Sequence, residues 1–113
     1  MAAVHHFTSG QGETFSTVVT WDIDGELVDL TGYSARMQLR KKYSSAEAAI
    51  SLDEASGLEL GGVAGTIDVV IEAATSSAVP AIKYVYDLEL ESAGGVVKRL
   101  LEGTFTLTPE VSK

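Results

Sequence analysis

The chain has 113 residues, of which 45% are hydrophobic, with 8 basic against 16 acidic residues and no cysteine. This length suits one domain with its own core, and the lack of cysteine excludes disulfides and thiolate metal sites. The net charge of −8 disfavours contact with a phosphate backbone, so we expect no nucleic-acid partner.

The N-terminal residues, 1–11, are predicted to form an arm. They lack the basic start and long apolar run of a signal peptide, and no stretch of the chain approaches the ~20 apolar residues of a membrane span. We therefore expect a soluble protein made in the cytoplasm, without a membrane partner. A first strand is expected at 4–8, followed by a flexible joint at 9–12. His5 and His6 are adjacent and would point to opposite sides of an extended chain, which argues against a metal or catalytic pair.

The next segment, 14–30, is predicted to form a hairpin. Its first arm alternates, and the predicted inward face carries Phe15, Thr17, Val19, Trp21 and Ile23. Asp24 and Gly25 predict a tight two-residue turn. This turn would place Trp21 opposite Val28, and Val19 opposite Leu30. We expect Trp21 to lie in the core between two sheets.

The run 22–26 also looks like the start of a calcium-binding loop. An EF-hand would need a glutamate at the twelfth loop position, where this chain has Tyr33, and a helix on each side. The hairpin interpretation is therefore favoured, and weak calcium binding by an irregular loop stays open. Residues 29–33 are typical of a corner, because Asp29 can bond its own backbone and Gly32 tolerates positive φ.

The segment 34–42 is predicted to be a strand with a basic outer face. It alternates between Ala35, Met37 and Leu39 inward and Arg36, Gln38, Arg40 and Lys42 outward. A second predicted strand, 84–91, has an acidic outer face made of Asp87, Glu89 and Glu91. If the two strands are neighbours, these charges pair across the ladder. We therefore expect ion pairs between the two faces, in preference to an anion-binding patch on the basic cluster 36–42.

Between these two strands the signals are shorter. Strands are predicted at 50–52, at 58–60 and, with Ile67, Val69 and Ile71 facing inward, at 66–71. The polar connection that follows is predicted to hold a single helical turn, capped by Thr75 and ended by Pro80.

The stretch 83–109 is predicted to be a β-hairpin that turns at Gly94 and Gly95. A two-residue turn there sets the register of both arms. It pairs Tyr84 with Phe105, Tyr86 with Gly103, Leu88 with Leu101, Leu90 with Arg99 and Glu91 with Lys98.

Short strands without a long helix predict an all-β protein, specifically an immunoglobulin-like antiparallel β-sandwich of about seven to nine strands. The domain would span residues 12–113, with the arm 1–11 before it. The open sheet edges would lie at Val4 and Ile50.

No residue set in the sequence points to catalysis, a cofactor or a metal. Without cysteine, and with both histidines near the N-terminus, neither a Cys-His pair nor a serine triad is supported, so we expect no enzyme. The glycine pairs 61–62 and 94–95 neither open a helix nor carry a P-loop lysine, and are predicted to be turns. Most aromatic side chains are predicted to face inward. Only Tyr33, Tyr43 and Phe7 are free to bind sugar, which leaves a carbohydrate-binding module as an alternative.

Several runs taken in order carry a family resemblance. They are 12–15, the strand ending at Trp21, the Asp-Gly hairpin, 28–40, 65–67, the turn at Thr75, 84–90 and 99–103. The chain resembles the small β-sandwich virion proteins of tailed bacteriophages. The likeness is to the collar or attachment proteins of long tail fibres and, more loosely, to baseplate and tail-tip sandwich domains.

This resemblance implies a structural role in the virion, after assembly in the host cytoplasm. The protein would be a tail-associated adaptor that contacts other virion proteins and itself, as a homo-oligomeric ring or lattice, without cofactor or active site. A capsid cement or decoration protein is the alternative within this class. The contacts are expected from the arm and from the segment 43–55, and the candidate residues are Val4, His5, His6, Phe7 and Tyr43.

Overall fold

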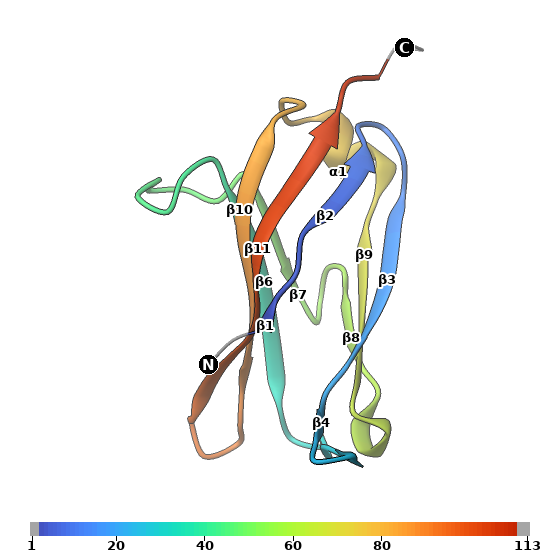
Figure 1. Cartoon of the computed structure of the whole chain (residues 1–113), viewed down its shortest axis with the longest axis vertical. Coiled ribbons are helices and arrows are strands. Elements are labelled where there is room, and N and C mark those ends of the chain that lie inside the picture. Colours follow the sequence, from blue (N-terminus) through green and yellow to red (C-terminus); the bar gives the residue numbers. More distant parts are fainter. Residues whose placement is uncertain (1–2, 111–113) are drawn as a thin grey trace.

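The structure, a computed structural model, describes residues 3–110. Over this range the chain forms eleven strands, one short α-helix and one 3-10 helix (Figure 1). The predicted all-β class is confirmed.

The larger sheet has six strands. These are β1 (Ala3–Val4), β2 (Phe7–Gly10), β6 (Ser34–Arg40), β7 (Ile50–Asp53), β10 (Lys83–Glu91) and β11 (Val97–Thr108). Their order is β1–β11–β10–β6–β7, and β2 continues from β1 along the same side of β11. Both N-terminal strands run parallel to β11, whereas the other pairs are antiparallel. Val4 and Ile50 therefore lie on the two edge positions of this sheet, as predicted.

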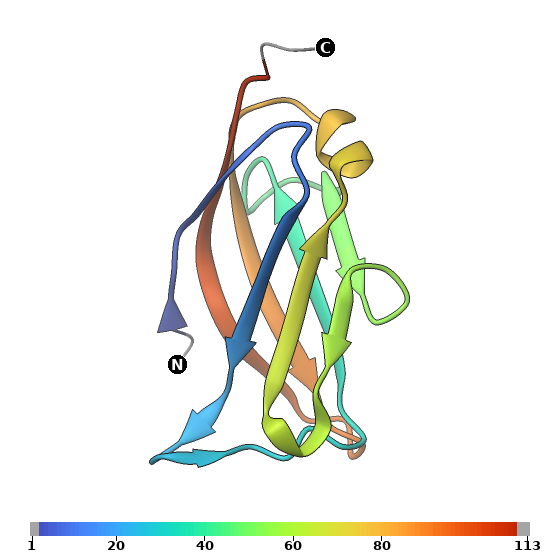
Figure 2. The ribbon, with the colours of Figure 1, turned by 90° about the vertical axis from the view of Figure 1, so that its right-hand side faces the viewer.

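The second sheet has three strands and faces the first (Figure 2). Its strands are β3 (Phe15–Thr20), β9 (Thr66–Ile71) and β8 (Leu58–Leu60), in that order. The ribbon of β4 (Asp22–Ile23) and β5 (Glu26–Leu27) joins β3 to β6, and the helix α1 (Ala73–Ser77) joins β9 to β10. The 3-10 helix η1 (Gly62–Ala64) lies between β8 and β9 within the second sheet.

Alternating side chains from both sheets form one apolar core. The predicted inward residues of β6 and β9 are all buried: Ala35, Met37, Leu39, Ile67, Val69 and Ile71. Tyr84 and Phe105 from the C-terminal hairpin are fully buried beside them. Burial of apolar area at about 25 cal/mol per Å² is the main force that holds the two sheets together.

Two features are those of immunoglobulin-type sandwiches. The strands β3, β9 and β8 facing β11, β10, β6 and β7 correspond in order to strands B, E and D facing G, F, C and C′. In addition, Tyr84, near the start of β10, donates its hydroxyl hydrogen bond to the carbonyl of Pro80, the contact known as a tyrosine corner. The immunoglobulin-like form stays a prediction, which these two features favour.

The C-terminal hairpin follows the predicted register only up to Leu88 and Leu101. Beyond that point the register shifts, so the predicted pairs of Leu90 with Arg99 and Glu91 with Lys98 are wrong: Leu90 faces Lys98 and Glu91 faces Val97. The turn is one residue longer than predicted, because Ser92 donates to the Val96 carbonyl and Gly95 takes a φ of +86°. A bulge at Leu100 on β11 compensates for that extra residue.

The hairpin 14–30 is also shorter than predicted. The Val28 amide donates to the Trp21 carbonyl at 3.0 Å, so that predicted pair is confirmed. Val19, however, pairs with Ile67 and not with Leu30, because β3 joins β9 in the second sheet. Trp21 is only partly buried and packs against the end of the core, which corrects the prediction that it lies between the sheets.

The predicted cap of α1 is wrong as well. The helix begins at Ala73, and Glu72 occupies the N-cap position with no side-chain capping hydrogen bond. Thr75 lies inside the helix and donates its amide to the Glu72 carbonyl. Ser76 is the buried residue of this turn, and its hydroxyl accepts a hydrogen bond from the Gly12 amide at 2.9 Å.

Candidate functional site

The predicted contact residues of the arm lie along β11 of their own sheet. Val4 pairs with Glu102, and Phe7 pairs with Phe105. The described part of the arm is therefore a parallel edge of the sandwich within one chain. Pairing of this segment with a neighbouring subunit stays a prediction.

The two histidines form the connection between β1 and β2, and hydrogen bonds hold that connection in place. The His5 carbonyl accepts a hydrogen bond from the Tyr86 hydroxyl at 2.7 Å, and the His5 amide donates to the Glu102 carbonyl at 2.9 Å. The ring nitrogen Nδ1 of His6 accepts from the Thr104 amide at 3.1 Å. This connection requires glycine at position 103, because a Cβ there would overlap the His5 carbonyl. Both histidines are exposed, and each is also held by these structural contacts.

Phe7 is partly buried against the core and is not the free aromatic side chain that was predicted. Its ring centroid lies 5.4 Å from that of Phe15, 5.5 Å from that of Tyr86 and 5.8 Å from that of Phe105. Val4 is exposed, beside a groove of about 340 Å³ that lies between the arm and β3. Of these two predicted contact residues, Val4 is the one available to a partner.

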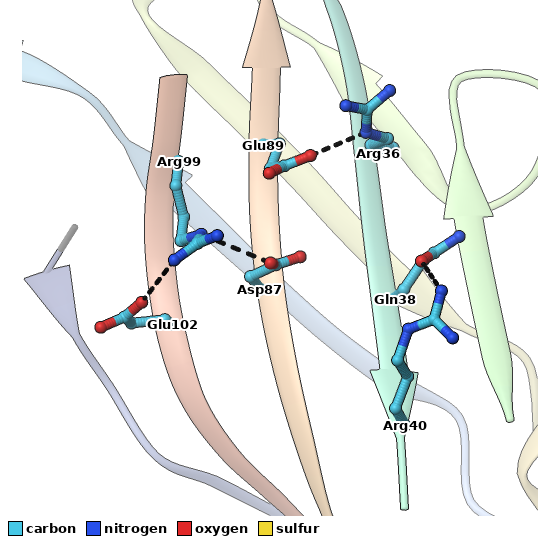
Figure 3. A network of polar contacts seen from close by, with 7 residues as sticks. All are labelled: Arg36, Gln38, Arg40, Asp87, Glu89, Arg99 and Glu102. Carbon is cyan, nitrogen blue, oxygen red and sulfur yellow. Dashed lines mark hydrogen bonds and ion pairs between the residues drawn. The ribbon is translucent and has the colours of Figure 1, made fainter. Parts of the chain in front are cut away.

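The outer face of the larger sheet carries the predicted ion pairs (Figure 3). Strands β6 and β10 are neighbours, and Nε of Arg36 lies 2.8 Å from Oε1 of Glu89. Arg99 on β11 lies 3.4 Å from Asp87 and 3.2 Å from Glu102. The prediction of adjacent basic and acidic strands is confirmed.

These pairs change the protonation equilibria on the sheet. The hydrogen bond from Arg36 to Glu89 raises the pKa of the guanidinium above its ordinary value. Burial, followed by the charge of Glu89, raises the pKa of the Asp87 carboxyl even though Arg99 opposes that change. Arginine and carboxylate therefore largely neutralise one another across this face, which leaves it without a strong net attraction for an anion.

Two of the four basic residues in the cluster 36–42, Lys41 and Lys42, lie beyond the end of β6. Arg40 donates to the Ser45 carbonyl at 2.9 Å and to the Gln38 side chain at 2.8 Å. Within residues 3–110, neither Lys41 nor Lys42 forms an ion pair. Tyr43 follows them and is 80% exposed. We call residues 41–43 the basic loop, and the sequence interpretation missed its lysines because it assigned the whole cluster to the strand.

A depression of about 270 Å³ separates Tyr43 from the ion pairs of the sheet. A sugar would stack on a flat exposed ring such as this one. The polar groups around the depression, however, already bond one another, as Gln38 does with Arg40 and Asp87 with Arg99. The depression consequently supports carbohydrate binding poorly.

A second exposed surface lies at the opposite end of β6. Four large apolar side chains are exposed on the connections that lie there, and a fifth is exposed at the start of β11: Ile23, Leu27, Val63, Val96 and Val97. Those connections are the β4–β5 ribbon, η1 and the β10–β11 turn, which lie at the lower end of the molecule in Figure 1. Hydrogen bonds from Leu30 to Gly62 and from Trp21 to Gly65 link the ribbon region to η1. We call this surface the apolar end.

The β4–β5 ribbon is the most acidic part of the apolar end. Asp24 and Gly25 have φ values of +52° and +86°, as a two-residue primed turn requires, so the predicted turn is confirmed. Ile23 is 57% exposed rather than inward as predicted, and Leu27 is 54% exposed. Around them lie Asp22, Asp24 and Glu26, all exposed.

The corner after the ribbon forms as predicted. Oδ1 of Asp29 accepts hydrogen bonds from the Thr31 amide at 2.9 Å and from its hydroxyl at 2.6 Å. These bonds lower the pKa of the Asp29 carboxyl. Gly32 takes a φ of +85° and lies against Ala93, which connects the corner to the β10–β11 turn.

Metal and membrane sites find no support in the part of the chain that the structure describes. No group of three or more histidine, aspartate or glutamate residues among 3–110 is arranged to hold a metal ion. Over the same residues, no helix has the length and apolar character needed to traverse a bilayer.

A comparison with models of known protein families and a search of curated proteins found no match for this chain.

Proposed function

We propose that this protein is a structural subunit of a tailed bacteriophage particle, a tail-associated adaptor that acts through protein–protein contacts. The observation that carries the proposal is the distribution of exposed apolar side chains. They lie mainly at one end of the sandwich and along its N-terminal edge, whereas the broad face of the larger sheet carries paired charges.

Such a distribution suits a subunit that joins its neighbours by ends and edges. Exposed apolar patches on a small soluble domain mark interaction sites, because burying them releases water. Edge strands add a second kind of contact through their free backbone groups. The resemblance of the sequence to virion sandwich proteins supports the same role.

A capsid cement or decoration protein is the alternative within the same class. It would use the same kind of contacts but would bind the head lattice in place of the tail. The two roles differ in position on the particle and in copy number.

The proposal is tested by fractionation of gradient-purified particles. We expect the protein to remain with intact particles after a high-salt wash, at a small fixed number of copies set by tail symmetry. Copies in the hundreds would favour the decoration role. Complete loss from washed particles, with the protein present in the lysate, would contradict both. A nonstructural protein encoded by the same phage serves as the control for carry-over.

A further inference from the structure

The basic loop and the apolar end are complementary in charge and in chemistry. The basic loop offers Lys41 and Lys42, which form no ion pair within residues 3–110, beside the exposed ring of Tyr43. The β4–β5 ribbon offers acidic side chains around exposed Ile23 and Leu27. A depression of about 470 Å³ follows this ribbon between Ile23 and Val28.

One chain cannot bring these two surfaces together. β6 begins beside the apolar end, at Ser34, and ends at Arg40, next to the basic loop. Seven residues of strand span ~23 Å at ~3.3 Å per residue. A contact between the two surfaces therefore joins different copies of the chain.

We propose that copies of this protein associate head to tail, with the basic loop of one copy bound to the β4–β5 ribbon of the next. Tyr43 packs against Ile23 and Leu27, in the way that aromatic side chains anchor interface cores. The lysines face Asp22 and Glu26. This inference rests on the proposed structural function and names the partner surface as a second copy of this chain.

Such a contact has a consequence for assembly. Because the two contacting surfaces differ, the contact is heterologous, and repeated copies close into a ring or extend into a filament. Both surfaces of each copy are then used, except at the ends of an open chain.

The test uses two charge-reversed variants of the full chain. One is Lys41→Glu/Lys42→Glu, and the other is Asp22→Lys/Glu26→Lys. Each variant alone places like charges across the contact, whereas in a mixture every contact between the two different variants has opposite charges. Sedimentation velocity over a concentration series in 0.1 M salt measures the association.

We expect the wild-type chain to associate, each variant alone to bind itself at least tenfold more weakly, and the equimolar mixture to regain association. Association should also weaken in 1 M salt, where the Debye length falls from about 10 Å to about 3 Å. A wild-type chain that stays monomeric, a variant that associates as the wild type does, or a mixture that stays monomeric would each overturn the proposal.

Matched controls separate a specific contact from a change in net charge. Lys42→Glu and Lys83→Glu change the net charge equally, and both residues are exposed. Only Lys42→Glu should weaken association, and Tyr43→Ala should weaken it without any change in charge. Equal effects of the two lysine variants would contradict the contact. A monomeric wild-type chain that is nevertheless retained on particles would refute the head-to-tail contact and leave the virion role standing.

Discussion

The Tyr86 hydroxyl donates a hydrogen bond to the His5 carbonyl at 2.7 Å, across 81 positions of sequence. This bond holds the connection between β1 and β2 against the larger sheet. Gly103 on β11 pairs with Tyr86 on β10. Because Gly103 has no side chain, the connection between β1 and β2 can approach β11 closely. The buried Tyr86 hydroxyl and the absence of a side chain at Gly103 therefore add to the backbone pairing of β1 and β2 with β11 in holding the N-terminal segment.

Tyr86→Phe removes that bond while keeping the ring. We expect a loss of about 1 kcal/mol in the free energy of unfolding, as for a typical hydrogen bond. Amide exchange at His5, whose N–H donates to Glu102, should become faster. Tyr43→Phe is the control, since Tyr43 is exposed. Unchanged exchange at His5 in the Tyr86 variant would show that the hydroxyl does not hold the segment.

Burial also raises the pKa of Tyr86 to about 12, above the ordinary value of 10. A group with a raised folded-state pKa contributes stability below its unfolded pKa and loses that stability as pH rises through the folded value. We therefore expect the free energy of unfolding to fall between pH 10 and pH 12. Urea titrations across this range should show a smaller fall in Tyr86→Phe. An equal fall in both proteins would assign the alkaline effect to other groups.

Phe7 should contribute to stability although it belongs to the predicted arm. Phe7→Ala removes a ring that contacts Phe15, Tyr86 and Phe105. We expect a cost of about 2 kcal/mol, below the 3–5 kcal/mol of a fully buried phenylalanine, because Phe7 is only partly buried. The control Val4→Ala should change the unfolding midpoint little, since Val4 is exposed. Equal small effects would mean that the arm is not part of the cooperative core.

The docking of the arm illustrates what sequence patterns leave out. Antiparallel hairpins were predictable because their two arms are joined by a turn whose chemistry is visible in the sequence, as with Tyr84 and Phe105. The parallel pairing of Phe7 with Phe105 has no such local signal, since almost the whole chain lies between the partners. Even in the hairpin, the bulge at Leu100 was not predictable, because Gly94 and Gly95 fit a two-residue and a three-residue turn equally well.

The Arg36–Glu89 pair should contribute little to stability despite its short distance. Arg36 is about half exposed, and surface ion pairs contribute about 0.2–1 kcal/mol. A double-mutant cycle with Arg36→Ala and Glu89→Ala should give a coupling energy of about 0.5 kcal/mol that shrinks in 1 M salt. A coupling energy above ~2 kcal/mol would mean that the pair is screened from water far more than its exposure indicates.

Gly65 should be intolerant of a side chain because it lies under the start of the β4–β5 ribbon. Its φ is +68°, and a Cβ there would lie 2.9 Å from the Trp21 carbonyl oxygen and 3.0 Å from that of Val28. We expect Gly65→Ala to cost on the order of 2 kcal/mol or more. Gly25→Ala is the matched control, with a φ of +86° and no atom within 4 Å of its Cβ. Similar losses in the two variants would show that the close approach adds nothing.

The candidate interaction surfaces were only partly predictable. The alternation of charged and apolar residues correctly predicted that Arg36 lies beside the acidic strand. The same alternation predicted a strand that continues to Lys42, which is too long. The strand ends at Arg40, whose side chain bonds the Ser45 carbonyl and starts the turn. Ile23 was assigned inward because it continues the alternation of β3. The chain leaves that sheet at Trp21, so the alternation no longer reports which side faces the core.

The central claim, a structural role in the virion through protein–protein contacts, is tested most directly by immunogold labelling of intact particles. Antibodies against the purified domain should label one fixed position on the tail of every particle, and particles without the protein should carry no label. Label spread over the head would replace the tail role by the decoration role. Absence of label from intact and from partly disassembled particles, with the protein abundant in the infected cell, would contradict a virion role altogether.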